Sequence, residues 1–162
     1  MVPAAFDLDA VDLRLLDLLQ QDASRTNQAL AEAAHVSPAT ALRRVRRLTE
    51  AGVIARQVAL LGPPFADAGL TVIAEVSLDA QGTELLDAFE TRAVADPAVR
   101  QCWRVSPGPD FVLVLQAADM PAWGAVVQRL FTQDANVRNV KSFFSVKRAK
   151  HETAVDLSSR LR

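Results

Sequence analysis

The sequence predicts an α+β fold in which three N-terminal helices precede a doubled strand–helix–strand unit, and three observations support this. Apolar residues recur every three or four positions up to about residue 50, which is typical of amphipathic helices. The pattern then changes to short apolar runs that alternate with helical segments. Finally, the segments ADPAVR at 95–100 and QDANVR at 133–138 match at Asp, Val and Arg, which indicates an internal repeat.

Composition limits the class of protein. The chain has 162 residues, half of them apolar, which is enough for one ordinary domain or two small ones. Its 18 basic and 19 acidic side chains leave a net charge of −1, so overall charge neither favours nor excludes an anionic partner. The single cysteine excludes an internal disulfide framework. Because no apolar segment is long enough to span a membrane and the start lacks a signal-peptide pattern, we expect a soluble cytoplasmic protein. The sequence also shows no metal-ligand cluster and no phosphate-binding glycine loop, so we expect no cofactor or metal.

Three helices are predicted in the N-terminal part. The first covers residues 8–21, with Asp9 as its N-cap and Asp12 in the first turn, where negative charge suits the helix dipole. The second covers about 27–34. The third begins with Ser37 as N-cap and Pro38 in the first helical position, the residue types that these positions prefer, and ends near Gly52.

The apolar runs at 53–54 and 58–61 predict two strands, or a wing and a linker strand, before Gly62-Pro63-Pro64 interrupts the chain. This divides the sequence into residues 1–57, a linker strand over 58–68, a second domain over 69–148 and a C-terminal tail over 149–162.

The second domain contains two strand–helix–strand units. The first comprises a strand over 70–78, a helix around Phe89 and a strand over 98–105; the second comprises a strand over 111–115, a helix from Trp123 to Phe131 and a strand over 139–147. This order is the ferredoxin-like βαββαβ arrangement. Both helices then cover one face of the sheet. The other face carries Ile73 and Phe143, so we expect it to be covered in a homodimer.

Four arginines fall within residues 43–47 of the third helix. Helical spacing places Ala41, Leu42, Val45 and Leu48 on a buried stripe, while Thr40, Arg43 and Arg47 lie opposite. A short helix, a tight turn and a second helix with an arginine-rich outer face are the layout of a winged helix-turn-helix, whose second helix enters the major groove of double-stranded DNA.

In that geometry the N-terminal end of the helix, which begins at Ser37 and Pro38, lies closest to the bases. We therefore expect base contacts from Ala39, Thr40 and Arg43. Arginine is suited to this role because it binds guanine O6 and N7 bidentately. Arg44, Arg46 and Arg47 contact phosphates, supported by Arg25 and Thr26 near the second helix. The alternative is an ordinary solvated helix face. However, only Glu50 lies within helical reach of the cluster, so most of its positive charge is expected to lack a local partner.

The segments LDAVDLRLLDLLQQD, LAEAAHVSPATALRRVRRLTEAGVI, ALLGPPFADAGL and CWRVSPGPDFVL together resemble the Lrp/AsnC family, also called feast/famine regulators, from Leu8 onward. The resemblance implies a transcriptional regulator that binds DNA as a dimer, assembles into octamers, and responds to an amino-acid effector bound by the C-terminal domain.

The chain departs from the family pattern at three positions. His35 replaces a turn glycine and Asn136 replaces a second glycine, but both residue types tolerate left-handed backbone. In the effector loop, usually Gly-x-x-Asp-Tyr/Phe, Pro107 replaces the first glycine. The resemblance assigns Ser106, Gly108 and Asp110 to the effector, with Asp110 receiving its ammonium group. The alternative is that this loop is only a rigid hairpin turn that Asp110 caps.

Two other functions are compatible with parts of this pattern. An architectural DNA-binding protein without effector control would bend DNA through phosphate contacts. Tetrapyrrole decarboxylases resemble this two-part architecture but rely on histidine in the C-terminal domain, where this chain has none between His35 and His151. We therefore expect no enzyme activity.

Overall fold

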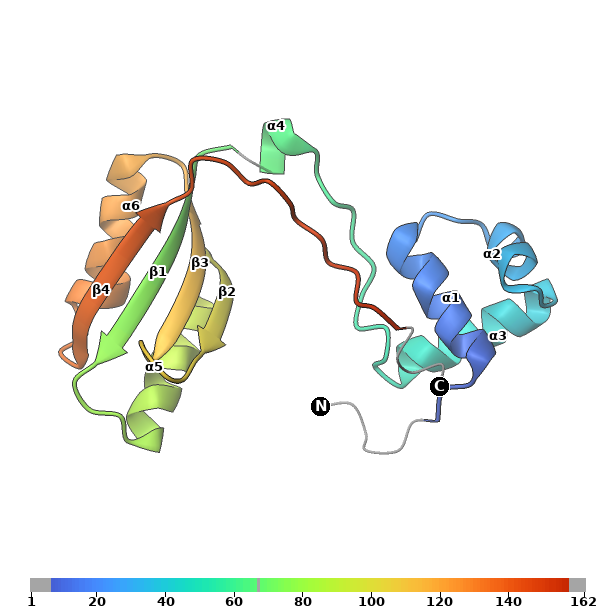
Figure 1. The fold of residues 1–162 in the computed structure, drawn as a ribbon, viewed down its shortest axis with the longest axis horizontal. Helices are drawn as coiled ribbons and strands as arrows, with labels where there is room; N and C mark the ends of the chain where they lie inside the picture. Colours follow the sequence, from blue (N-terminus) through green and yellow to red (C-terminus); the bar gives the residue numbers. More distant parts are fainter. Residues whose placement is uncertain (1–6, 67, 158–162) are drawn as a thin grey trace. The chain divides into compact units, whose positions relative to one another are not determined.

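The computed structural model describes residues 7–66 and 68–157. The chain divides into two compact units, one formed by residues 1–60 with 150–162 and the other by residues 61–149 (Figure 1). The chain thus passes from the first unit to the second and returns to the first near its C-terminal end.

The first unit contains three helices, α1 (Ala10–Gln21), α2 (Asn27–Ala34) and α3 (Pro38–Glu50). As predicted, Asp9 caps α1: its Oδ1 accepts hydrogen bonds from the backbone N–H of Val11 at 2.9 Å and of Asp12 at 3.0 Å. The predicted start of α3 is also confirmed, since the Ser37 hydroxyl accepts from the backbone N–H of Thr40 at 3.2 Å and Pro38 occupies the first turn.

The turn between α2 and α3 depends on His35. This residue adopts left-handed backbone, with φ 56° and ψ 46°, and its N–H bonds the carbonyls of Ala31 and Glu32 at the end of α2. Histidine is one of the residue types that tolerates this conformation, so the turn forms without glycine, as expected.

Small side chains let the three helices approach closely. The buried cluster of the first unit consists of Leu15, Leu30, Ala31, Ala34 and Ala41. The predicted stripe on α3 is correct for Ala41 and Leu48 but wrong for Leu42, whose side chain is 60% exposed. Helical spacing places Leu42 beside Val45, but the other two helices cover the side of α3 that is centred on Ala41 and Leu48.

The predicted wing and linker strands do not form. Residues 55–62 have no regular secondary structure, and the short helix α4 (Pro63–Ala66) follows them. The apolar runs at 53–54 and 58–61 have no partner strand within the described residues, and an extended segment without a partner forms no hydrogen-bonded ladder.

The second unit is the predicted ferredoxin-like domain. It contains β1 (Leu70–Leu78), α5 (Thr83–Ala95), β2 (Val99–Arg104), β3 (Phe111–Ala117), α6 (Met120–Val127) with its continuation η1 (Gln128–Thr132), and β4 (Val137–Phe144). The strand order is β2-β3-β1-β4 with all neighbours antiparallel. Strand β4 begins and ends earlier than the predicted 139–147.

The domain core lies between one face of the sheet and helices α5 and α6 (Figure 1). Alternate residues of the two central strands point into it, so Val72, Ala74 and Val76 of β1 and Phe111, Leu113 and Leu115 of β3 are fully buried. Phe89 of α5 packs on Phe111 with ring centroids 4.8 Å apart.

Two ion pairs cross between the repeated units. Asp96 and Asp134 occupy equivalent positions in the two repeats, and each accepts a hydrogen bond at 2.9 Å from a backbone N–H of its own turn. Arg129 of η1 binds Asp96 with two nitrogens, at 2.6 and 2.8 Å, and Arg92 of α5 binds Asp134. Each repeat therefore supplies the cation for the turn of the other.

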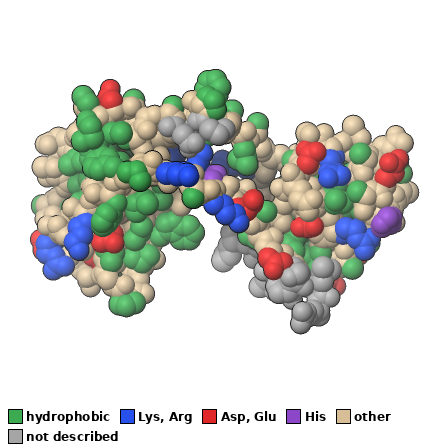
Figure 2. Space-filling model, turned by 45° about the horizontal axis from the view of Figure 1, so that its top comes forward, with side chains coloured by type: hydrophobic (Ala, Val, Ile, Leu, Met, Phe, Trp, Pro, Cys, Tyr) green, Lys and Arg blue, Asp and Glu red, His purple; other side chains and the backbone are tan. Residues whose placement is uncertain are grey.

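The opposite face of the sheet is apolar and exposed, as predicted. Ile73 of β1 lies directly across from Phe143 of β4 and from Val114 of β3. Phe143 remains 51% exposed, and Trp103 of β2 continues the apolar surface toward the sheet edge. Figure 2 shows hydrophobic side chains gathered over the visible side of this unit.

Candidate nucleic-acid interface

The outward face of α3 carries two well-exposed arginines. Ala39, Arg43 and Arg46 are spaced three to four residues apart, so they share the side of the helix that faces away from α1 and α2. Within the described residues Arg43 has no carboxylate partner. Arg46 binds Glu50 of the same helix through Nε at 2.7 Å, with side chains that are 78% and 64% exposed.

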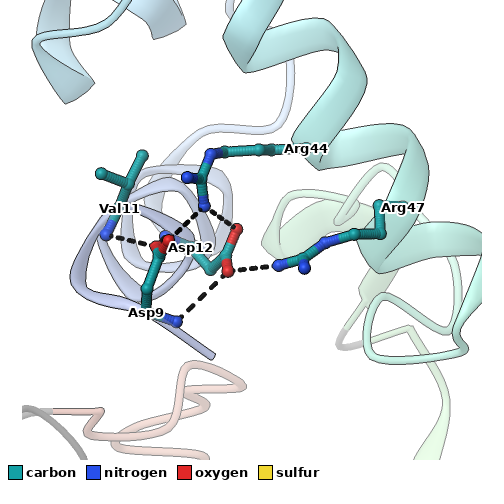
Figure 3. Close-up of polar contacts among 5 residues, drawn as sticks. All are labelled: Asp9, Val11, Asp12, Arg44 and Arg47. Atoms are coloured by element: carbon teal, nitrogen blue, oxygen red, sulfur yellow. Dashed lines mark hydrogen bonds and ion pairs between the residues drawn. The ribbon is translucent and has the colours of Figure 1, made fainter. Parts of the chain in front are cut away.

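Arg44, which the sequence predicts to contact phosphates, does not lie on this face. Its side chain is 20% exposed, and Nη1 binds the carboxylates of Asp9 at 2.7 Å and Asp12 at 2.9 Å (Figure 3). Hydrogen bonds to these two carboxylates raise the pKa of the Arg44 guanidinium. In turn, the pKa of Asp9 is lowered by the backbone N–H of Asp12 and by Arg44.

Arg47 also bonds to Asp12. Its Nη2 binds Oδ2 of Asp12, whose carboxylate is completely buried between α1 and α3 (Figure 3). Three of the four arginines therefore have carboxylate partners, and the expectation that most of this charge lacks one was wrong. Helical spacing finds only Glu50, because Asp9 and Asp12 are brought close by the packing of α1 on α3.

The start of α3 is held by a small polar network. The hydroxyls of Ser37 and Thr40 bond each other at 2.9 Å. Asn27, at the start of α2, donates through Nδ2 to the carbonyl of Pro38 at 2.9 Å. Sequence reasoning missed Asn27, since only the left-handed turn at His35 brings the two helix starts together. Asn27 fixes the position of the residues predicted to approach bases.

The predicted anchors near α2 have different surroundings. Thr26 is the N-cap of α2, where its hydroxyl accepts from the backbone N–H of Ala29 at 3.2 Å. Arg25 is half-buried, and its Nε has no hydrogen-bond partner among the described residues. Its remaining nitrogens are the groups that could reach an anion near this helix start.

The predicted effector loop connects β2 to β3. Ser106 and Pro107 are joined by a cis peptide bond, and Gly108 adopts φ 123°, a backbone conformation that glycine permits. Asp110 closes the loop: its N–H donates to the carbonyl of Val76 at 2.9 Å and its Oδ2 accepts from the N–H of Leu78 at 2.7 Å. Asp110 thus ties the hairpin to β1, while Oδ1 has no partner among the described residues.

Other site types lack support within residues 7–66 and 68–157. No group of three or more His, Cys, Asp or Glu side chains there is arranged to hold a metal ion. None of the helices in that part of the chain has the length and apolar character needed to cross a bilayer.

A helix-turn-helix unit with an exposed arginine face, followed by a ferredoxin-like domain, defines a two-domain DNA-binding regulator. Residues 8–55 match the family model described as winged helix-turn-helix DNA-binding, and residues 71–155 match the one described as Lrp/AsnC ligand binding domain. The chain belongs to the Lrp/AsnC family of DNA-binding transcriptional regulators, which the resemblance had implied.

Individual regulators are similar to this chain over nearly its whole length. The leucine-responsive regulatory protein of Rhizobium meliloti is 35% identical, over 93% of this chain and 97% of its own length. A Neisseria meningitidis transcriptional regulator, solved in complex with L-Met, is 29% identical with a TM-score of 0.86, covering 96% of this chain and all of that one. An AsnC family regulator from Agrobacterium tumefaciens is 28% identical with a TM-score of 0.85, covering 94% and 99%.

Proposed function

We propose that the chain reads duplex DNA with the outward face of α3. The observation that carries the proposal is the exposure of Ala39, Arg43 and Arg46 on one side of a helix that α1 and α2 hold from behind. Arg43 contacts base edges, with Ala39 and Thr40 beside it at the N-terminal end of the helix. Arg46 contacts phosphates, because its partner Glu50 is exposed and easily exchanged.

Ser37 and Pro38 place the first turn of α3 at the groove, and Arg25 and Thr26 contact the adjacent phosphate backbone at the start of α2. Helix starts favour such contacts, because their free N–H groups point toward the anion. Arg44 and Arg47 are not assigned to phosphates here, since both bind Asp12.

We further propose that the chain forms a homodimer through the exposed sheet face that includes Ile73 and Phe143, and that dimers assemble into an octamer. An apolar face of this kind is typical of an interaction surface. A dimer presents two α3 helices to one DNA, so the operator is expected to be an imperfect palindrome with half-sites about one DNA turn, roughly 34–36 Å, apart.

The effector is proposed to be an amino acid bound near Ser106, Gly108 and Asp110. Oδ1 of Asp110 is available for an ammonium group, while Oδ2 is held by Leu78. The L-Met in the Neisseria relative supports this class of ligand. We infer that the protein acts in the cytoplasm, where its DNA and effector are found, as a regulator and not as an enzyme.

Two measurements test these proposals. Footprinting should show a protected palindrome, and replacement of Arg43 by alanine should relax the preference at one base position in each half-site. In a thermal-shift screen of amino acids, a true effector at 100 times its Kd should stabilise the fold by about 2.7 kcal/mol. Protection of DNA without any stabilising amino acid would favour the architectural alternative. Two features of the loop agree with that alternative: Asp110 is bonded to Leu78, and Pro107 replaces the family's glycine.

A further inference from the structure

We propose that Asp12 suppresses sequence-independent DNA binding by holding Arg44 and Arg47 away from DNA phosphates. This inference rests on the proposed function, namely that α3 enters duplex DNA. Asp12 is then a positioning residue: it makes no contact with DNA itself, but by binding Arg44 and Arg47 it leaves only the other arginines of α3 available for DNA.

Both oxygens of the Asp12 carboxylate are occupied (Figure 3). Oδ1 accepts from Nη1 of Arg44 at 2.9 Å, while Oδ2 accepts from Nη2 of Arg47 and from the backbone N–H of Asp9 at 3.3 Å. The side chain is 0% exposed. Asp9 adds a second carboxylate to Arg44 at 2.7 Å.

A phosphate would compete with these carboxylates for the same guanidinium groups, because both anions accept hydrogen bonds from arginine in the same planar arrangement. Moving both Arg44 and Arg47 to phosphates would leave the buried charge of Asp12 without a cationic partner, and moving either one would remove one of its two ion pairs; both changes are unfavourable for a buried carboxylate. The pair between Arg46 and Glu50 differs, since both side chains are exposed and a phosphate can replace the glutamate with little loss.

On a duplex whose bases it does not read, helix α3 therefore offers two guanidinium groups to phosphates, Arg43 and Arg46, although the helix contains four arginines. The dependence of log affinity on log salt has a slope of about 0.9 per phosphate neutralised. Each bound α3 should then contribute a slope of about 1.8 to sequence-independent binding, instead of about 3.6 for four free arginines.

The location of Arg44 adds to this effect. It lies on the side of α3 that faces α1, away from Ala39, Arg43 and Arg46. A phosphate could reach Arg44 only with α3 turned away from the orientation that places Arg43 at base edges. Release of Arg44 would thus favour complexes that read no sequence.

The test uses the full chain and two duplexes: one that the wild-type protein selects from a random pool, and a shuffled duplex of the same composition. Affinity is measured by fluorescence anisotropy at a series of KCl concentrations. Arg43→Gln and Arg47→Gln form the matched pair, since each removes one charge from the same helix. Asp12→Asn removes the buried carboxylate from both arginines and leaves Arg44 only its pair with Asp9, and Asp12→Glu keeps the charge.

On the shuffled duplex, Arg43→Gln should lower the slope by about 0.9 for each α3 bound, whereas Arg47→Gln should leave it unchanged. Asp12→Asn should raise the slope by about 0.9 to 1.8 and reduce the ratio of selected to shuffled affinity. Asp12→Glu should restore the ratio. A purely structural role for Asp12 would weaken binding to both duplexes without raising the slope.

Equal slope reductions for Arg47→Gln and Arg43→Gln would overturn the proposal, as would a folded Asp12→Asn protein with the wild-type slope. Circular dichroism melting establishes whether Asp12→Asn folds; if it does not, the matched pair alone decides. Failure of the proposed function has a different signature, because the wild-type protein would then select no sequence from the random pool and would not bind a duplex of random sequence.

Discussion

The side-chain amide of Gln20 and the backbone of Val155 exchange two hydrogen bonds, across 135 positions of sequence. Nε2 of Gln20 donates to the carbonyl of Val155 at 3.2 Å, and the N–H of Val155 donates to Oε1 of Gln20 at 2.7 Å. The C-terminal segment is thereby attached to α1, in agreement with the grouping of residues 150–157 with the DNA-binding unit.

Loss of this attachment should release the tail. Gln20→Ala removes both hydrogen bonds, so trypsin should cut faster at Lys147, Arg148 and Lys150 while the melting temperature changes little. Limited proteolysis followed by mass spectrometry measures the cutting rate. Gln21→Ala is the matched control, because Gln21 bonds only to Asp17 of the same helix among the described residues. Equal cutting rates in the two variants would contradict the attachment.

Alanine substitution should have opposite effects at two glycines. Gly69 has φ 82°, and a Cβ there would lie 2.3 Å from the carbonyl oxygen of Ala117, so Gly69→Ala should destabilise the domain severely. Gly124 is exposed within α6 and a Cβ there would meet nothing, so Gly124→Ala should stabilise it by about 0.5–1 kcal/mol. Urea denaturation provides both values. A tolerated Gly69→Ala would contradict the close approach of the two chain segments.

The Arg129–Asp96 pair should make stability depend on pH at the acid end. Arg129 holds the pKa of Asp96 below its usual 3.8, so the folded state favours the ionised form. Its contribution is therefore fully present above the unfolded pKa and is lost as the pH falls through the lower, folded value. Asp96→Asn should remove about 1.5–3 kcal/mol near neutral pH and flatten the acid dependence.

Asp87 provides a comparison for that measurement. It pairs with Arg104 at 2.6 Å, but its side chain is 62% exposed. Asp87→Asn should therefore change the free energy of unfolding by less than about 1 kcal/mol. Acid titrations of both variants, followed by circular dichroism, would contradict the argument if Asp87→Asn lost as much stability as Asp96→Asn.

A charge on the exposed sheet face should separate the proposed homodimer. Phe143→Asp would require an unpaired carboxylate to be buried at the apolar interface, so sedimentation should show monomers at concentrations where the wild-type protein is dimeric. Val94→Asp is the control, because Val94 is also apolar and is 65% exposed but lies on α5, which covers the other face. Dimeric Phe143→Asp protein would place the interface elsewhere.

Local sequence signals predicted most of the fold. Several predicted features depend only on neighbouring residues, and the structure contains all of them: the N-caps Asp9 and Ser37, the proline at the start of α3 and the left-handed turn at His35. The repeat at 95–100 and 133–138 predicted the βαββαβ order for a similar reason: each copy is a turn with its own aspartate cap.

Features that depend on distant residues were missed or wrong. The partners of Arg44 and Arg47 lie 32 to 35 positions away, beyond the reach of helical spacing. The exposure of Leu42 depends on which side of α3 the other helices cover. The predicted linker strand would need a partner strand, which the described residues do not provide. The contacts proposed for DNA and effector remain predictions.

The attachment of Val155 to Gln20 has a practical consequence for handling the protein. A tag or fluorescent label fused on the C-terminal side of Val155 would emerge from the unit that binds DNA, not from the ferredoxin-like domain. Such a fusion adds bulk to the DNA-binding unit, so an immobilised or labelled version should carry its handle on the ferredoxin-like domain, for example at a cysteine placed on the exposed side of α5.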